Sequence, residues 1–170
     1  MALATTVPDP VGTAVRDKIM KQKEFVGKRV VSLADGVEIG KVKDLVFTGL
    51  NLSALVIAGE RGDGLLPFES ISANGPDAIT IESFQLIDWN AGSTLTPESR
   101  TTQEIEKLKV IDAKGTMIGR LHDFKMNPNG WIEEIYIRTD GVFGIGAHET
   151  TVPSSKVRAI GAFLITVDAT

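Results

Sequence analysis

The side chains best suited to acid–base or metal chemistry are scarce in this sequence of 170 residues. It contains two histidines, His122 and His148, and no cysteine. The histidines do not form the HxH or HExxH spacing that holds a metal ion on one strand or helix. The lack of cysteine excludes disulfides, thiolate metal ligands and cysteine nucleophiles. We therefore expect neither a bound metal nor a cofactor.

Asp44 and Asp123 are the carboxylates whose sequence surroundings recur, which makes them the first candidates for a catalytic role. Each stands without a paired acid, and acid–base chemistry needs a second group within reach. His122 precedes Asp123, but Lys43 takes the same place before Asp44, so we interpret this position as exposed and polar. A hydrogen bond from each aspartate to nearby backbone is the simpler role. We expect no catalytic residue and a protein that is not an enzyme.

A glycine-rich stretch over residues 141–146 has the composition of a phosphate-binding loop. It does not fit the GxxxxGK[ST] pattern, and it does not follow a strand and open a helix. We interpret it as the tip of a hairpin. His148 and Glu149 follow it without further residues that would complete a metal site.

Three aromatic residues are candidates for an interaction surface, because aromatic side chains often anchor protein interfaces. They are Trp89, Trp131 and Phe143. For Trp89 and Trp131 the sequence equally allows a second role, filling a cleft between two units of the chain. Phe143 is the first to test, since it stands in the glycine-rich stretch.

These residues are set in an internal repeat, which is the main feature of the sequence. Gly36, Gly40 and Asp44 recur 79 residues later as Gly115, Gly119 and Asp123, and Pro67 recurs 86 residues later as Pro153. The second copy therefore holds seven more residues than the first between these motifs. We expect the insertion within residues 139–149.

Each copy has the pattern of a small all-β unit. β-branched and alternating runs cover residues 29–33, 39–47, 52–58, 64–67 and 78–81, with turn residues between them. Asp35-Gly36, Lys114-Gly115 and Asn129-Gly130 predict hairpin turns, since glycine tolerates positive φ. Gly40 and Gly119 lie inside predicted strands and indicate a bulge or bend, whereas Pro67 and Pro153 suit strand ends.

The sequence predicts four segments. They are an N-terminal segment over 1–24 that is helical or disordered, a first unit over 25–90, a polar linker over 91–104 and a second unit over 105–170. A unit of about 60 residues is marginally stable alone. We therefore expect the two units to pack on each other as a pseudo-dimer.

Composition and charge narrow the functional classes. The net charge is −4 at pH 7, and residues 25–90 alone carry −4. Nucleic-acid binding usually needs a basic face, so the charge argues against it. No run approaches the length of a transmembrane segment, and the N-terminal residues lack the features of a secretory signal, so we expect a cytoplasmic protein.

The repeated motif resembles the PRC-barrel family. The first copy carries Asp35-Gly36, Ile39-Gly40-Lys41-Val42, Asp44, Leu66-Pro67-Phe68 and Ile71. The second carries Lys114-Gly115, Ile118-Gly119-Arg120-Leu121, Asp123 and Val152-Pro153. The resemblance implies a six-stranded SH3-like barrel in each copy, as in the cytoplasmic domain of the photosynthetic reaction centre H subunit and in a bacterial ribosome-maturation factor.

In those settings the barrel is a protein-binding or assembly module and not an enzyme. The resemblance therefore predicts a non-catalytic module that binds a protein partner, with a second copy of the chain as one candidate for that partner. An accessory role in ribosome or RNA metabolism is an alternative. A small-molecule site in a cleft between the barrels is another, because ligands often bind between domains.

Overall fold

The computed structural model describes residues 24–90, 95–106, 108–139, 146 and 148–168. The strands of its first unit are β1 (Arg29–Ser32), β2 (Glu38–Thr48), β3 (Asn51–Gly59), β4 (Gly62–Pro67), β5 (Ile71–Asn74) and β6 (Ala78–Ile81). Those of its second unit are β8 (Lys109–Asp112), β9 (Met117–Met126), β10 (Ile132–Thr139), β11 (His148–Pro153), β12 (Val157–Ile160) and β13 (Leu164–Val167). The expected all-β fold with two tandem units is confirmed.

Both sheets follow the same path. The first runs β4-β3-β2-β1-β6-β5 and the second β11-β10-β9-β8-β13-β12. In each, the first and last strands of the unit pair in parallel, β1 with β6 and β8 with β13, whereas the other neighbours on this path are antiparallel. Pro67 and Pro153 each end a strand and lead into a single 3-10 turn, η3 (Phe68–Ser70) or η6 (Ser154–Lys156). The sequence repeat is therefore a repeat of topology.

The strand glycines lie beside an irregularity in strand pairing and at a close approach of backbone. A Cβ on Gly40 would lie 2.3 Å from the Ala58 carbonyl oxygen, and one on Gly119 would lie 2.3 Å from that of Arg138. The pairing with the preceding strand shifts register just beside each glycine. Only glycine fits there, because any side chain would strike the neighbouring strand.

The repeated aspartates accept hydrogen bonds from the backbone. The Leu45 N–H donates to Asp44 Oδ1 at 2.7 Å, and the Phe124 N–H donates to Asp123 Oδ1 at 2.8 Å. Both bonds lie at a register shift between the long strands, β2 with β3 and β9 with β10. The carboxylate thus satisfies a backbone donor where the ladder is interrupted.

The hairpin turns are present but longer than two residues. Residues 33–37 join β1 to β2, 113–116 join β8 to β9, and 127–131 join β9 to β10. Gly36, Gly115 and Gly130 have φ of 68°, 83° and 85°. Asn127 Oδ1 accepts from the N–H groups of Asn129 and Trp131 in the third turn. The extra residues follow from these side-chain and backbone bonds, which close wider loops than a two-residue turn.

The insertion of the second copy lies mainly between β10 and β11, which residues 140–147 connect, whereas residues 60–61 connect β3 to β4. Most of the connection falls outside the described residues, and so do Phe143 and the glycine-rich stretch apart from Gly146. The N-terminal segment over 1–23 also lies outside them.

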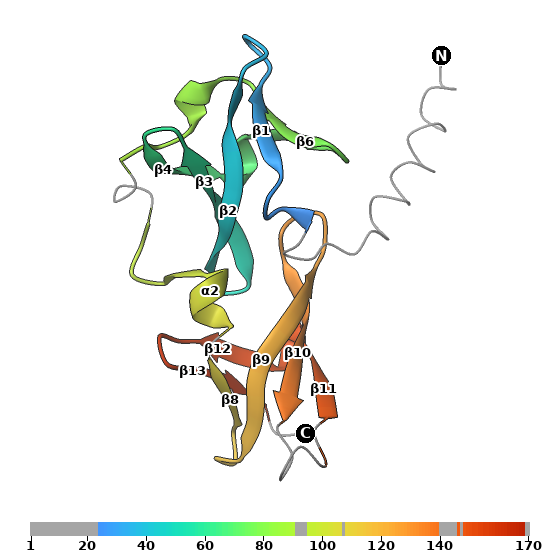
Figure 1. The fold of residues 1–170 in the computed structure, drawn as a ribbon. Coiled ribbons are helices and arrows are strands. Elements are labelled where there is room, and N and C mark those ends of the chain that lie inside the picture. The colour runs from blue at the N-terminus through green and yellow to red at the C-terminus, as the bar shows by residue number, and fades with distance from the viewer. Residues whose placement is uncertain (1–23, 91–94, 107, 140–145, 147, 169–170) are drawn as a thin grey trace, which may run out of the picture.

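The linker is part of the fold. Its residues form β7 (Ser99–Thr101), which pairs antiparallel with the end of β2, and α2 (Thr102–Ile105). Thr101 and Glu104 form a reciprocal capping box at the start of α2. Ile105 is fully buried, and α2 lies between the two sheets (Figure 1). The sequence composition alone suggested only a polar connection.

The two units share one hydrophobic core. Buried residues of both belong to a single cluster, including Val30, Leu45, Phe47 and Leu55 of the first unit and Val110, Phe124, Ile135 and Ile165 of the second. The rings of Phe47 and Phe124 meet edge to face with centroids 5.2 Å apart. The units therefore pack on each other as expected for a pseudo-dimer. In the part of the chain that the structure describes, no helix has the length and apolar character needed to cross a bilayer.

Candidate binding groove on the first unit

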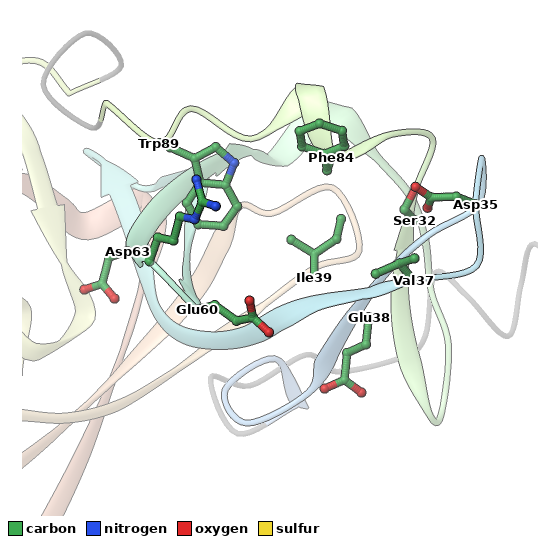
Figure 2. Close-up of a pocket in the computed structure, with 10 residues that line it drawn as sticks. Ser32, Asp35, Val37, Glu38, Ile39, Glu60, Asp63, Phe84 and Trp89 are labelled. Atoms are coloured by element: carbon green, nitrogen blue, oxygen red, sulfur yellow. The ribbon is translucent and has the colours of Figure 1, made fainter.

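A groove of about 570 Å³ opens on the first unit, at the end where the β1–β2 and β3–β4 turns lie (Figure 2). Its lining residues are Ser32, Asp35, Val37, Glu38, Ile39, Glu60, Arg61, Asp63, Phe84 and Trp89. Its volume lies within the range of ligand-binding pockets. Its apolar residues surround the centre and its charged residues stand at the rim.

Trp89 forms one wall by lying against the glycines of the β3–β4 hairpin. A Cβ on Gly59 would lie 2.7 Å from its ring, and a Cβ on Gly64 would lie 2.6 Å from it. The absence of side chains at both positions therefore makes room for the indole. The tryptophan keeps 41% of its surface exposed, so it is held in place and still available to a ligand.

The segment that carries the aromatic wall is fixed by backbone bonds. Leu65 and Asp88 exchange two N–H···O bonds of 2.8 Å, which add a short bridge at the edge of β4. The Ser83 hydroxyl accepts from the Gln85 N–H at the start of η4 (Phe84–Leu86). Ile87 is buried between these points, and Phe84 is left 51% exposed over the groove.

The opposite wall is the turn between β1 and β2. The N–H groups of Leu33 and Ala34 donate to the carbonyls of Ile81 and Glu82, which ties the turn to the end of β6. Val37 is 53% exposed on this wall. Figure 2 shows Ile39 between Val37 and Trp89. The groove thus presents four apolar side chains from three different parts of the first unit.

Ser32 contributes a buried polar atom to the lining. The residue is 1% exposed, and its hydroxyl has no hydrogen-bond partner within the described part of the chain. Its backbone groups are used, because its N–H donates to Val37 and its carbonyl accepts from Gly36. A buried hydroxyl without a partner is unfavourable, so this position holds unused hydrogen-bonding capacity at the groove.

Four carboxylates and one guanidinium stand at the rim. Glu38 pairs with Arg29 at 3.4 Å, and Asp63 accepts from Lys43 at 2.8 Å. This hydrogen bond, together with the charge of Asp63, raises the pKa of Lys43 above its usual value. Asp35 and Glu60 form no ion pair with another described residue. The guanidinium is that of Arg61, so carboxylates outnumber cations four to one in the groove lining.

The second unit carries different residues at the matching places. Lys114 replaces Asp35, Thr116 replaces Val37 and Met117 replaces Glu38 in the repeat register. The acidic rim around the first turn is therefore specific to the first unit, although both units share the same strand path.

The sequence-based interaction candidates fall in different places. Trp89 lies in the groove, whereas Trp131 lies where the units meet and keeps 51% of its surface exposed. Phe143 lies outside the described residues. Two further lining residues, Phe84 and Ser32, are not predicted from the sequence. The sequence did hold a signal for an aromatic site. Glycines at 59, 62 and 64 precede a segment with two aromatic residues, and this segment lies outside the repeated motifs.

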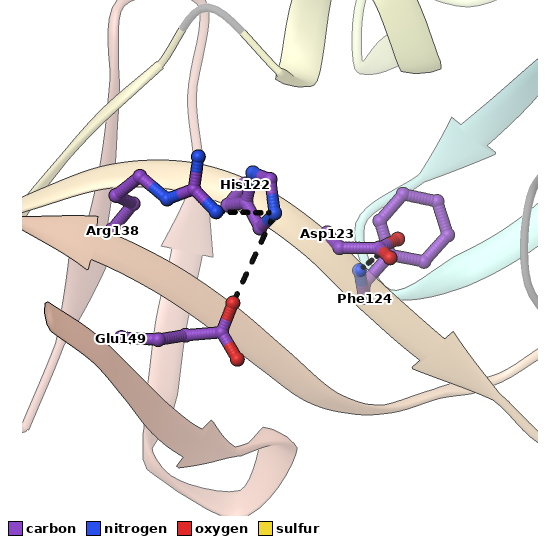
Figure 3. Close-up of polar contacts among 5 residues, drawn as sticks. All are labelled: His122, Asp123, Phe124, Arg138 and Glu149. Atoms are coloured by element: carbon purple, nitrogen blue, oxygen red, sulfur yellow. Dashed lines mark hydrogen bonds and ion pairs between the residues drawn. The ribbon is translucent and has the colours of Figure 1, made fainter.

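The histidine candidates do not assemble a metal site. His122 Nε2 lies 3.1 Å from Arg138 Nη2 and 3.9 Å from Glu149 Oε2, in an exposed polar group (Figure 3). His148 Nδ1 contacts the Gly146 carbonyl at 2.9 Å. Among the described residues, no group of three or more histidine, aspartate or glutamate side chains has the arrangement to hold a metal ion.

The fold and the groove define a tandem β-barrel-like protein with an aromatic groove on its first unit. The family model of the PRC-barrel domain matches residues 17–86, a stretch that includes strands β1 to β6 of the first unit. The second unit repeats the strand order of that domain and lies outside the matched residues. No curated protein matches the chain.

Proposed function

We propose that this chain is a non-catalytic module that binds a protein partner through the groove of its PRC-barrel domain. The observation that carries the proposal is the pair of half-exposed aromatic residues, Phe84 and Trp89, over an apolar groove. Such anchors dominate the energetics of many protein interfaces, particularly where a rim of polar groups surrounds them.

The chemistry of the lining supports binding in preference to catalysis. Ser32 is the hydroxyl residue of the lining, and its Oγ has no hydrogen-bonded base among the described residues. A serine nucleophile needs such a base within reach. The residues that line the groove include no histidine that could act as this base.

Two other functions have less support. The charge of −4 over residues 25–90 opposes direct contact with RNA. A ligand between the units would compete with the apolar side chains of the shared core, such as Phe47 and Phe124. The groove on the first unit offers free space without displacing the core.

The proposal is tested by comparing the proteins that the tagged chain captures from its native host with those captured by two variants. Phe84→Ser removes an aromatic from the groove, and Phe163→Ser removes an equally large aromatic, 85% exposed, from the second unit. We expect Phe84→Ser to lose at least one partner that Phe163→Ser retains. That partner is then purified and its affinity for each variant measured. Equal capture by all three chains would contradict the proposal.

A further inference from the structure

We infer that the groove accepts a peptide segment whose apolar side chain is flanked by lysine or arginine. This inference rests on the proposed function and adds the chemistry of the partner. Three observations carry it, namely the shape of the apolar centre, the charge of the rim and the unpartnered hydroxyl of Ser32.

The apolar centre has room for one or two side chains of a peptide. Phe84, Trp89 and Ile39 surround it, and Figure 2 shows all three turned toward the same space. Phe84 and Trp89 are each about half exposed. The site is therefore an open groove rather than an enclosed pocket. A small ligand is usually held with most of its surface buried, whereas a peptide lies in an open groove of this kind.

The rim favours positive charge on both sides of that apolar side chain. Asp35 belongs to the β1–β2 turn and Glu60 to the β3–β4 turn, and Figure 2 places them on either side of Ile39. Neither carboxylate forms an ion pair with a described residue, and the four carboxylates of the lining outnumber its one cation, Arg61. A cation beside each would satisfy them, and complementary charge chiefly sets specificity and the rate of association.

Ser32 supplies an independent reason to expect a polar contact. Its hydroxyl is buried at the groove and has no partner within the described residues. A peptide offers a backbone carbonyl once per residue, and such a carbonyl would accept the hydroxyl proton. A purely apolar ligand would leave the hydroxyl unsatisfied.

The test begins with a library of random heptapeptides displayed on phage and selected on the full chain. Peptides that also bind the Phe84→Ser variant are removed, so that only groove-dependent sequences remain. We expect these to place lysine or arginine next to leucine, isoleucine or an aromatic residue. Groove-dependent peptides with neutral or acidic flanks would overturn the inference and leave the proposed function standing.

A selected peptide is then synthesised with its lysines and with glutamates in their place. We expect the lysine form to bind about tenfold more tightly at low salt, and the difference to shrink at high salt because exposed charges are screened. Asp35→Asn with Glu60→Gln should lower the affinity of the lysine form severalfold. Asp77→Asn with Glu69→Gln is the matched control, since both residues are exposed and lie outside the groove lining.

Ser32→Ala separates a binding role from a structural one. If the hydroxyl bonds the peptide, this variant binds the selected peptide severalfold more weakly while its fold is unchanged. Equal affinity of Ser32→Ala would remove the hydroxyl from the inference. If the library yields no groove-dependent peptide but Phe84→Ser still loses a host partner, the peptide inference is overturned and the groove binds a folded partner instead. If the library yields no such peptide and Phe84→Ser also retains every host partner, the proposed function is overturned as well.

Discussion

Asn51 and Trp131 form an antiparallel bridge at the point where the two units meet. They occupy equivalent places in the structure, 80 residues apart, as do Ala58 and Arg138, whose carbonyls face the strand glycines of the two units. The flanking bonds repeat with the same spacing. Leu52 donates to the Gly130 carbonyl at 2.7 Å, and Ile132 donates to the Leu50 carbonyl at 2.8 Å. A contact in which equivalent residues pair with each other is the mark of a local twofold axis. The chain thus contains the interface of a symmetric dimer within one polypeptide.

The shared core predicts cooperative unfolding of the two units. Phe47 and Phe124 lie in one cluster, and separating the units would expose both rings to water. We expect a single calorimetric transition whose van't Hoff enthalpy equals the calorimetric enthalpy. Two resolved transitions would show that the interface contributes little to stability.

Gly130→Ala should destabilise the protein more than Gly115→Ala. Both glycines have positive φ, 85° and 83°, so both substitutions strain the backbone by about 1–2 kcal/mol. A Cβ on Gly130 would also lie 3.0 Å from the Phe68 ring and 3.1 Å from Leu52 Cβ, across the interface, whereas one on Gly115 meets nothing within 4 Å. We expect an additional loss of about 1–3 kcal/mol in urea unfolding of Gly130→Ala. Equal losses would mean that the interface adjusts freely.

Ser32→Ala should stabilise the free protein, because it removes a buried hydroxyl that has no partner in the described residues. We expect the free energy of unfolding to rise by about 1 kcal/mol. Thr102→Val is the control, since the Thr102 hydroxyl is also buried but lies within 3.5 Å of the Leu45 carbonyl. That variant should be neutral or less stable. Destabilisation by Ser32→Ala would indicate that the hydroxyl has a structural partner.

Glu106→Gln should stabilise the protein at neutral pH and not at acid pH. Partial desolvation of Glu106 and the nearby charges of Asp44 and Asp123 raise the pKa of its carboxyl above the usual value. A raised pKa favours the folded state below the unfolded pKa of about 4.3 and opposes it as the pH rises through the folded pKa. The carboxylate is exposed, so we expect a gain below about 1 kcal/mol at pH 7.

The measurement is urea unfolding of Glu106→Gln at pH 7 and at pH 3.5, with the exposed Glu98→Gln as control. The gain should be present in the first variant only and should vanish at the lower pH. A gain that persists at pH 3.5 would assign it to something other than the charge of Glu106.

Gly64→Ala should displace the indole of Trp89. Its Cβ would lie 2.6 Å from that ring and 2.6 Å from the Ile87 side chain, so the aromatic wall must move. In a Trp131→Phe background we expect the tryptophan emission to shift to longer wavelength as the ring becomes more exposed. Gly75→Ala is the control, because its nearest neighbour is the Ala78 carbonyl oxygen at 3.4 Å. An unchanged spectrum in Gly64→Ala would mean that Trp89 is not held against the hairpin.

The sequence predicted the fold where local patterns repeat. Gly36 with Gly115 and Pro67 with Pro153 act through their own backbone conformation, so their effect is visible in one stretch of chain. The strand glycines Gly40 and Gly119 were also recognised as special. The partner that requires glycine, the facing carbonyl of β3 or β10, came only from the structure.

The candidate site was predicted only in part. Trp89 was recognised by its residue type, but Phe84 and Ser32 reach the groove through contacts between segments about 50 residues apart. The linker was predicted as polar, whereas Ser99–Thr101 pairs with β2 and Ile105 enters the core. Pairing and burial of this kind depend on which surfaces the rest of the chain leaves open.

The sequence by itself determined the repeat, the all-β character of both copies and the positions of their special turns, because these follow from local backbone preferences and from self-similarity. Tertiary structure alone decided that Asn51 meets Trp131 on a local twofold axis and that Ser32, Phe84 and Trp89 share one groove. The physical reason is that such contacts arise from packing of distant segments, and packing is selected by the burial of the whole core rather than by any one stretch of residues.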